Sequence, residues 1–568
     1  GQTAAKEVSV PASWANAQDG EKPVLQLNTV NAEQDAYVRN ILIPTNNLEG
    51  DALPVSAFLP YVTGKVPSGT AAFEKRGIAV DIPVWHAENC TQCNWCSTVC
   101  PHAVIRPFIL KPEDAQGLTT VDCKSAPGKR FLIAVSAEDC TGCGSCAEMC
   151  PAHGKALFME RAAGRMHDDQ ETFEYAKKVG VQQGSGKNVK EAQFLRPYLE
   201  YSGACPGCGE TPYAKLITQL YGEKTYWVNG VGCSLAWAGA FPSLPYTKNK
   251  EGRGPAFYGT LFEDQAENGL GVVLATKQRR AYVKQVAQQL LPLVPGTELE
   301  TAINAWLSSF DDLDANDADA RKLTAALESA SLTGEAAELA EKLLKNKDQL
   351  GKKVVWLFGG DGWAYDIGYG GLDHVMASGE DINVFVVDTE VYSNTGGQSS
   401  KATPVGASAK FADGGKKTAK KDLGRLMMTY PNVYVASVAM GANPAQLMKA
   451  VTEAVAHKGP SIVIAYAPCI NHGIKAGMNN VQAEMKKAVD CGLWPLYRYD
   501  PNKTEKPFSL DYKKPSVPVE EFFNGEVRYA GLKIKYPETA AKLFAEAQVE
   551  ADARYETYVA LAHSYNKD

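Results

Sequence analysis

The chain has 568 residues, of which 45% are hydrophobic, and a formal net charge of −7. This length accommodates several domains with well-buried cores. Because basic residues are not in excess, the charge gives no support to nucleic-acid binding. We find no apolar run long enough to span a bilayer and no secretion signal in residues 1–20, so we expect a cytoplasmic protein.

Cysteine usage points to metal clusters. The chain has 14 cysteines, and all but Cys123 and Cys491 fall into spacings that suit cluster ligands. These spacings favour reduced thiols over the disulfide framework of a secreted protein. Since exposed iron–sulfur clusters degrade in oxygen, we expect an anaerobic or low-oxygen cell.

The beginning of the chain gives weak structural signals. Residues 1–50 are polar and irregular, and we interpret them as the tail of a missing upstream domain. Residues 51–87 alternate short apolar runs with Pro and Gly, which predicts a small strand-and-turn module.

Residues 88–160 contain the pattern CxxCxxCxxxCP twice. The first copy comprises Cys90, Cys93, Cys96 and Cys100, and the second Cys140, Cys143, Cys146 and Cys150. In bacterial-type two-cluster ferredoxins, the fourth cysteine of each run ligates the other cluster. We therefore assign one [4Fe–4S] cluster to Cys90, Cys93, Cys96 and Cys150, and a second to Cys140, Cys143, Cys146 and Cys100. Two zinc sites would need ligands that close locally and commonly include His, so they fit the pattern less well.

After a polar linker at residues 161–198, the sequence takes on α/β character over residues 199–500. Apolar runs at 354–360, 383–389, 432–440 and 461–468 alternate with helical patterns. This alternation predicts buried parallel strands with crossover helices. An Ala-, Glu- and Leu-rich stretch near 280–350 predicts a helical insertion, and residues 501–568 form a C-terminal extension that ends in an amphipathic helix.

A third, scattered cysteine set lies in the α/β region. Cys205 and Cys208 form a CxxC loop, Cys233 follows a short apolar run, and Cys469 follows a predicted strand. Open α/β sheets place ligand sites at the ends of their strands. Spacing alone leaves a [4Fe–4S] cluster, a zinc site and a redox dithiol open.

Two loops after predicted strands suggest a diphosphate site. Asp361 lies in GGDG after the strand at 354–360, and Thr389 begins the loop after the next strand. The glycines beside Asp361 let the backbone approach a diphosphate, and Asp361, Thr389 and the Val391 carbonyl offer oxygen ligands to Mg²⁺. Taken alone, GDG could be a tight turn, and Asn394 could be a turn residue or a group facing the reactive cofactor.

With these features in one chain, the sequence resembles pyruvate:ferredoxin (flavodoxin) oxidoreductases from about residue 30 to its end. The resemblance rests on FEKRG at 73–77, the tandem cysteine runs, LEYSGACPGCGETPY at 199–213, TLFEDQAENGLG at 260–271, GGDGWAYDIGYGGLDHV and DTEVYSNTGGQSSKATPVGA. It implies an α/β fold with a doubly wound domain that binds thiamine diphosphate. A small EKR-type module and a bacterial-type two-[4Fe–4S] ferredoxin domain would precede that domain.

The resemblance also implies site residues. The third [4Fe–4S] cluster, nearest to thiamine, would have the ligands Cys205, Cys208, Cys233 and Cys469. Mg²⁺ would be held by Asp361, Thr389 and Val391. The residues beside the cofactor would be Glu210, Cys233, Gly360, Asp361, Gly362, Trp363, Thr389, Glu390, Val391, Tyr392, Ser393 and Asn394. Asn394 would contact the reacting substrate.

The activity that the resemblance implies is oxidative decarboxylation of pyruvate with coenzyme A to acetyl-CoA and CO2. Electrons would pass through three [4Fe–4S] clusters to ferredoxin or flavodoxin, and the whole enzyme would be a homodimer. In the family, an N-terminal portion binds pyruvate and contributes to coenzyme A binding. That portion does not appear in this sequence, so we expect a C-terminal part, or one chain of a split enzyme, that turns over poorly alone.

Two other functions remain open. The same chemistry could act on another 2-oxo acid, or the chain could be an electron-transfer subunit without thiamine, against which Asp361, Thr389 and Asn394 argue. The loop that contains Lys410, Lys416, Lys417, Lys420 and Lys421 is interpreted as a solvated basic loop rather than a ferredoxin docking patch.

Overall fold

The computed structural model describes residues 29, 31–181, 184–239 and 242–566. The chain divides after Pro67 into two compact units. The division falls within the module predicted at residues 51–87. None of the described helices combines the length and the apolar character needed to cross a membrane.

The first unit is helical in its described part. Its elements are α2 (Ala32–Tyr37), the π-helical turn η1 (Val38–Leu42), α3 (Ile43–Asn46) and the 3-10 turns η2 (Gly50–Ala52) and η3 (Val55–Tyr61). The prediction of an irregular segment is therefore wrong for residues 32–46. Asn31 caps α2 through its side chain, and Tyr37, Val38, Ile41 and Leu42 are buried along the helical run. The expectation for residues 1–28 lies outside the described residues.

The second unit begins with a region that holds the cysteine runs. Its elements are η4 (Thr70–Phe73), β1 (Asp81–Trp85), η5 (Ala87–Asn89), α4 (Trp95–Val99), β2 (Ile105–Leu110), η6 (Pro112–Ala115), β3 (Val121–Asp122), β4 (Arg130–Val135), η7 (Ala137–Asp139), α5 (Ser145–Glu148), β5 (Leu157–Arg161), α6 (Met166–Val179) and α7 (Val189–Ala192). Strand β1 pairs with β5, and β2, β4 and β3 form a second antiparallel sheet. In residues 51–87 the only strand is β1, and 3-10 turns and loops make up the rest.

Helix α6 corrects the prediction of a plain linker at residues 161–198. Phe173 and Ala176 on this helix are buried in the same hydrophobic core as β2 and β4. The ring of Phe173 lies edge-on to Phe108, with centroids 5.6 Å apart. The ferredoxin-like region therefore includes α6.

The rest of the second unit is built on an eight-stranded sheet in the order β13-β12-β10-β11-β9-β8-β6-β7. The strands are β6 (Thr225–Asn229), β7 (Ala256–Gly259), β8 (Val354–Gly360), β9 (Asn383–Asp388), β10 (Tyr434–Val438), β11 (Ser461–Tyr466), β12 (Tyr497–Tyr499) and β13 (Phe508–Leu510). The six strands from β10 to β7 are parallel, and β12 and β13 add an antiparallel edge. Strands β8 to β11 coincide with the apolar runs that predicted them.

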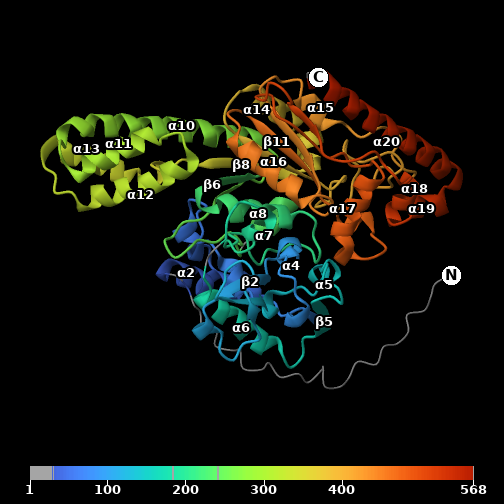
Figure 1. Cartoon of the computed structure of the whole chain (residues 1–568), viewed down its shortest axis with the longest axis horizontal. Coiled ribbons are helices and arrows are strands. Elements are labelled where there is room, and N and C mark those ends of the chain that lie inside the picture. Colours follow the sequence, from blue (N-terminus) through green and yellow to red (C-terminus); the bar gives the residue numbers. More distant parts are fainter. Residues whose placement is uncertain (1–28, 30, 182–183, 240–241, 567–568) are drawn as a thin grey trace. The chain divides into compact units, whose positions relative to one another are not determined.

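Helices cover this sheet (Figure 1). The helices and turns of this region are α8 (Thr211–Tyr221), η8 (Gly222–Lys224), α9 (Cys233–Gly239), η11 (Gly362–Ile367), α14 (Tyr369–Ala377), α15 (Leu423–Met427), α16 (Pro444–Ala456), η12 (Ile470–His472), η13 (Met478–Asn480) and α17 (Val481–Asp490). The C-terminal extension adds α18 (Val519–Phe523), α19 (Val527–Lys535) and the predicted amphipathic helix, α20 (Pro537–Tyr565).

The predicted helical insertion is present and has its own core. It comprises α10 (Gln265–Leu290), η9 (Leu291–Leu293), α11 (Glu298–Ser308), α12 (Leu313–Ser329), α13 (Gly334–Lys345) and η10 (Lys347–Gln349). Its buried side chains include Ile303, Trp306, Leu323 and Leu343. The insertion therefore packs mainly on itself.

Candidate functional site

The candidate site lies at the carboxyl ends of four adjacent parallel strands, β11, β9, β8 and β6. Residues from the predicted sites follow these strands in the order Cys469, Thr389, Asp361 and Cys233. Because parallel strands end at the same edge of a sheet, the fold brings together residues that are far apart in the sequence.

The three predicted magnesium ligands converge. The Thr389 hydroxyl donates to Asp361 Oδ1 at 2.9 Å and lies 3.0 Å from the carbonyl oxygen of Val391. Ser400 donates to Asp361 Oδ2 at 2.7 Å. Burial and, after it, the charge of Asp388 raise the pKa of Asp361 well above its ordinary value. A bound Mg²⁺ would stabilise the charged carboxylate, so these oxygen atoms fit a magnesium ion that shares a diphosphate.

The loop backbone fits a bound diphosphate at Gly360. A Cβ at Gly360 would meet no atom closer than 3.9 Å, which leaves space for a ligand, whereas a Cβ at Gly362 would lie 2.5 Å from the Tyr392 ring. Glu390 adopts φ 60°, an uncommon value for a non-glycine residue. Its buried carboxylate forms an ion pair with Arg528 at 2.7 Å, which holds this backbone in place.

The third cysteine set lines one cavity. The predicted residues in its wall are Cys205, Cys208, Glu210, Cys233, Thr389, Asn394 and Cys469. Ser393 Oγ lies 3.3 Å from Cys233 Sγ. The predicted cluster ligands and several predicted cofactor neighbours therefore share one space. Asp361 lies beside this cavity through its bond to Thr389, and Trp363 is buried.

Glu210 is a buried carboxyl group within this wall. Its Oε2 accepts a hydrogen bond from the Trp237 indole at 2.8 Å, and its backbone N–H donates to Cys208 Sγ at 3.4 Å. Burial raises the pKa of Glu210 to about 7, against the opposing effect of the Trp237 bond. The side chain can therefore hold or release a proton near neutral pH.

The tandem runs pair as predicted in space. Cys90, Cys93, Cys96 and Cys150 line one cavity between β1, α4 and the end of the second run. Cys100 lies close enough to Cys140, Cys143 and Cys146 for its charge to raise their pKa values. Burial raises the pKa of Cys140 to about 12, so coordination to iron would have to supply the stabilisation of its thiolate. We refer to the first group as the outer set, because Cys93 is exposed, and to the second as the inner set.

Among the described residues, no three His, Cys, Asp or Glu side chains come close enough to share a single metal ion. This absence does not bear on the proposed magnesium site, because only one of its three ligands, Asp361, belongs to these residue types. Cys123 and Cys491 are buried elsewhere, as expected for cysteines outside the clusters.

The structure brings the inner set against the third cysteine set. The Gly207 backbone lies close enough to Cys143 to lower the pKa of its thiol, and His102 Nε2 lies 2.8 Å from the carbonyl oxygen of Ala204, next to Cys205. His102 is buried, and burial lowers its pKa to about 4. Sequence reasoning missed His102 and Gly207, although His102 directly follows the first CP pair.

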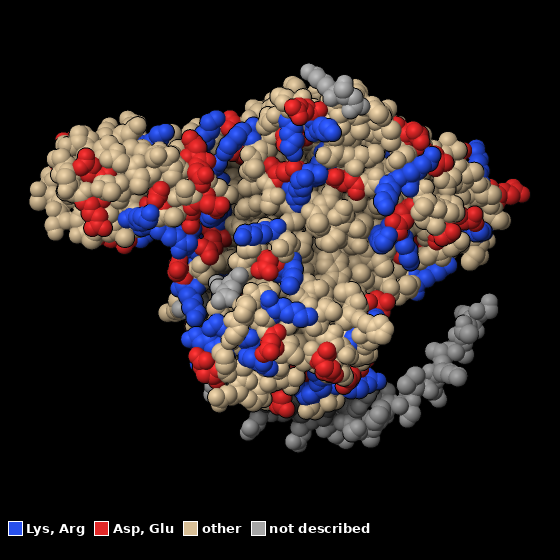
Figure 2. Space-filling model, in the orientation of Figure 1, with Lys and Arg blue, Asp and Glu red and all other residues tan. Residues whose placement is uncertain are grey.

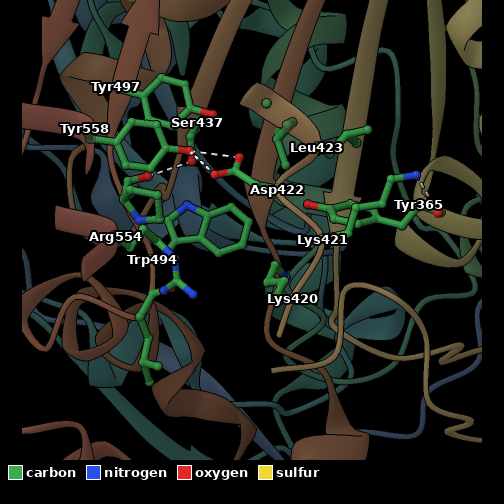
Figure 3. Close-up of a pocket in the computed structure, with 14 residues that line it drawn as sticks. Tyr365, Lys420, Lys421, Asp422, Leu423, Ser437, Trp494, Tyr497, Arg554 and Tyr558 are labelled. Atoms are coloured by element: carbon green, nitrogen blue, oxygen red, sulfur yellow. Dashed lines mark hydrogen bonds between the residues drawn. The ribbon is translucent and has the colours of Figure 1, made fainter. Parts of the chain in front are cut away.

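The basic loop is not fully solvated, which corrects the prediction. Lys416 donates to the carbonyls of Ser400 and Thr403, and Lys420 pairs with Asp388 at 2.8 Å. Lys421 donates to the Tyr365 carbonyl at 3.0 Å. Figure 3 shows Lys420 and Lys421 in a pocket with Trp494, Arg554 and Tyr558, where Tyr558 donates to Asp422. These lysines face internal oxygen atoms because the loop folds over the Asp361–Thr389 site.

Acidic and basic side chains are interspersed on the face shown in Figure 2. This mixed surface agrees with the absence of a charge signal for nucleic-acid binding.

Comparisons with known proteins agree with the two cofactor regions. Residues 334–465 match the C-terminal TPP-binding domain of thiamine pyrophosphate enzymes, residues 89–154 match a 4Fe–4S dicluster domain, and residues 26–79 match the EKR domain of unknown function. The predictions of a domain that binds thiamine diphosphate and of 4Fe–4S clusters are thereby confirmed.

Among whole proteins, the chain is 49% identical to pyruvate:ferredoxin oxidoreductase of Moorella thermoacetica, over 98% of this chain and 48% of that protein. It is 46% identical to pyruvate-flavodoxin oxidoreductase of Klebsiella pneumoniae, over 99% of this chain and 48% of that protein. A solved 2-oxoglutarate:ferredoxin oxidoreductase from Magnetococcus marinus aligns with 16% identity and a TM-score of 0.26, over 48% of this chain and 65% of that chain, too weakly to support an argument. The chain spans about half the length of the curated relatives that it matches. Over nearly all of its own length it is similar to pyruvate:ferredoxin and pyruvate-flavodoxin oxidoreductases, as the sequence motifs predicted.

Proposed function

We propose that this chain is the cofactor-carrying part of a pyruvate:ferredoxin or pyruvate-flavodoxin oxidoreductase. The reaction would convert pyruvate and coenzyme A to acetyl-CoA and CO2, and two electrons would leave singly to ferredoxin or flavodoxin. The observation that carries the proposal is the shared cavity, in which Cys233 and Cys469 lie beside Thr389 and Asn394. Bound thiamine diphosphate would supply the electron sink, and three [4Fe–4S] clusters would supply one-electron carriers.

The chain's own residues have distinct roles in this proposal. Asp361, Thr389 and the Val391 carbonyl hold Mg²⁺ against the diphosphate. Asn394 faces the reacting substrate, and Glu210 holds a proton in the buried wall of the cavity. The Glu390–Arg528 ion pair keeps the magnesium loop in its strained conformation.

Two contacts support an order for the clusters. Gly207 lies close to Cys143, and the Ala204 carbonyl lies close to His102. The third cysteine set therefore adjoins the inner set. Electrons would then leave the chain from the cluster of the outer set, since Cys93 is exposed.

The surface beside the outer set is suited to an acidic electron carrier. Cys93 opens into a groove lined by Trp95, Lys187, Lys190, Lys449 and other residues. The lysines would attract an acidic ferredoxin or flavodoxin and orient it toward the outer cluster. Replacing the three lysines by Gln should slow reduction of the carrier at low salt, whereas Lys417→Gln in the basic loop should not. An equal effect of both changes would count against this exit.

The substrate and the assembly are part of the same proposal. A portion outside this chain would bind pyruvate and help bind coenzyme A, and the whole enzyme would be a cytoplasmic homodimer of an anaerobic or low-oxygen cell. Another 2-oxo acid is the competing substrate. The two are separated by comparing cluster reduction by pyruvate, 2-oxobutyrate and 2-oxoglutarate in the assembled enzyme, where pyruvate should be fastest.

The decisive test of the cofactor set is iron per chain in anaerobically purified protein. Three [4Fe–4S] clusters predict about twelve irons, and a ferredoxin pair alone predicts about eight. A thiamine assay on protein purified with Mg²⁺ should find about one thiamine diphosphate per chain, as one diphosphate site implies. About eight irons at full sulfide occupancy would remove the cluster next to thiamine and with it the proposed electron path.

A further inference from the structure

Lys215 on α8 is a buried lysine that reaches into the ferredoxin-like region. The residue is only 2% exposed. Its Nζ donates to the carbonyl oxygen atoms of Ser97, Thr98 at 3.0 Å and Cys100 at 3.2 Å. These carbonyls belong to the end of α4 and the residue after it, so a side chain from the thiamine-binding region closes the C-terminus of a helix in the first cysteine run.

The hydrogen-bond geometry favours the ammonium form of this side chain. All three partners are carbonyl oxygen atoms, which only accept hydrogen bonds. A neutral amine has two N–H donors, whereas an ammonium group has three. The three carbonyl partners therefore match the ammonium form of Lys215, and among the described residues no carboxylate forms an ion pair with it.

This charge lies between the two ferredoxin-type cluster sites. Ser97 directly follows Cys96, a ligand predicted for the outer cluster, and Cys100 belongs to the inner set. Cys96 and Cys100 both lie close enough to Lys215 for their charges to interact with it. One buried ammonium group is thus close to a ligand of each cluster.

We propose that Lys215 raises the reduction potentials of both ferredoxin-type clusters by placing a buried positive charge between them. The proposal rests on the two clusters of the proposed function. Each reduction adds one negative charge to a cluster, and a nearby fixed cation stabilises the reduced form. The interaction is strong because the site is buried and little screened. The third cluster, bound by Cys205, Cys208, Cys233 and Cys469, would not depend on Lys215.

The test is an anaerobic redox titration followed by electron paramagnetic resonance on the full chain. Lys215→Gln removes the charge but keeps two N–H donors for the α4 carbonyls. We expect the midpoint potentials of the two ferredoxin-type clusters to fall, each by at least a tenfold change in the reduction equilibrium, which is about 59 mV for one electron. The third cluster should keep its potential, and Lys215→Arg should restore the other two.

Lys224→Gln is the matched control. Lys224 also donates to a main-chain carbonyl, that of Leu313, and pairs with Asp314. Its loss should leave all three potentials unchanged.

A purely structural role predicts a different outcome. If Lys215→Gln loads its full iron and keeps the wild-type potentials, the proposal is wrong and Lys215 only caps α4. Lys215→Met serves as a second neutral variant. If both neutral variants lose iron of the two ferredoxin-type clusters, so that the total falls below the wild-type value of about twelve, Lys215 is assigned to cluster assembly and the proposal ends. Absence of iron from the wild-type chain would instead refute the proposed function, so the two failures are distinguishable.

Discussion

The buried ion pair between Arg106 and Glu200 offers the sharpest test of how the ferredoxin-like region is held to the thiamine-binding region. Arg106 on β2 pairs with Glu200, and the two residues are 7% and 3% exposed. Burial by itself would raise the pKa of Glu200, but Lys177, Arg106 and Arg196 lower it to about 2. The difference from the ordinary value of 4.5 corresponds to about 3 kcal/mol.

The sign of this contribution sets the conditions of the assay. Because the pKa of Glu200 is lowered on folding, its stabilisation is complete above about pH 4.5 and is lost as the pH falls toward 2. Measurements at pH 7 therefore capture the whole effect. Glu200→Gln should cost about 3 kcal/mol, because it leaves the buried Arg106 without a carboxylate partner. Arg106→Met should also cost about 3 kcal/mol, because it leaves Glu200 with only the more distant Lys177, at 3.8 Å.

The assay is amide hydrogen exchange of β2 and β4 in anaerobic holoprotein, with a double-mutant cycle. The double variant Arg106→Met/Glu200→Gln should lose at least about 1 kcal/mol less than the sum of the single losses. Asp122→Asn, which breaks an exposed pair with Arg130 in the same sheet, should cost less than about 1 kcal/mol. Additive losses, or an equal loss at Asp122, would refute the reasoning that burial makes this pair important.

Three further predictions concern the cofactor sites and the insertion. Asp361→Asn should abolish binding of thiamine diphosphate with Mg²⁺ in calorimetric titration while iron content stays constant, and retained binding would remove Asp361 from the magnesium site. Cys469→Ser should lower iron from about twelve to about eight per chain, whereas Cys491→Ser should leave it unchanged; the reverse result would reassign the fourth ligand. Leu343→Ala in the core of the helical insertion should destabilise that insertion by about 2–5 kcal/mol in hydrogen exchange, with unchanged thiamine binding; weaker thiamine binding would show that the insertion shapes the site.

The sequence predicted the buried strands and the cysteine runs, because both have patterns that can be recognised within a short stretch of residues. The apolar runs of β8, β9, β10 and β11 are continuous because these strands are buried on both faces, and this is why they were recognisable. The cysteine runs were recognisable because the spacing of their cysteines lies within a short segment of sequence. The helical run at residues 32–46 was missed because the overall polarity of residues 1–50 outweighed the helical spacing of Tyr37, Val38, Ile41 and Leu42.

The contacts between regions could not be predicted from the sequence. The partners of Lys215 lie at Ser97 and Cys100, and nothing local in α8 indicates that its lysine points into a distant cysteine run. The same holds for the approach of the Gly207 backbone to Cys143. The strand ends predicted that Thr389 and Cys469 share an edge, but only the strand order, with β11 beside β9, places them side by side.

The enclosure of the inner set has a consequence for how the protein matures. Cys100, Cys140 and Cys146 are buried, and Cys143 is covered by Gly207 from the neighbouring region. We expect iron and sulfide to enter this site before the two regions close, whereas the outer site stays reachable through Cys93. Folded protein stripped of its clusters should then rebuild the outer cluster readily and the inner one only after partial unfolding, an order that timed sampling of iron incorporation would reveal.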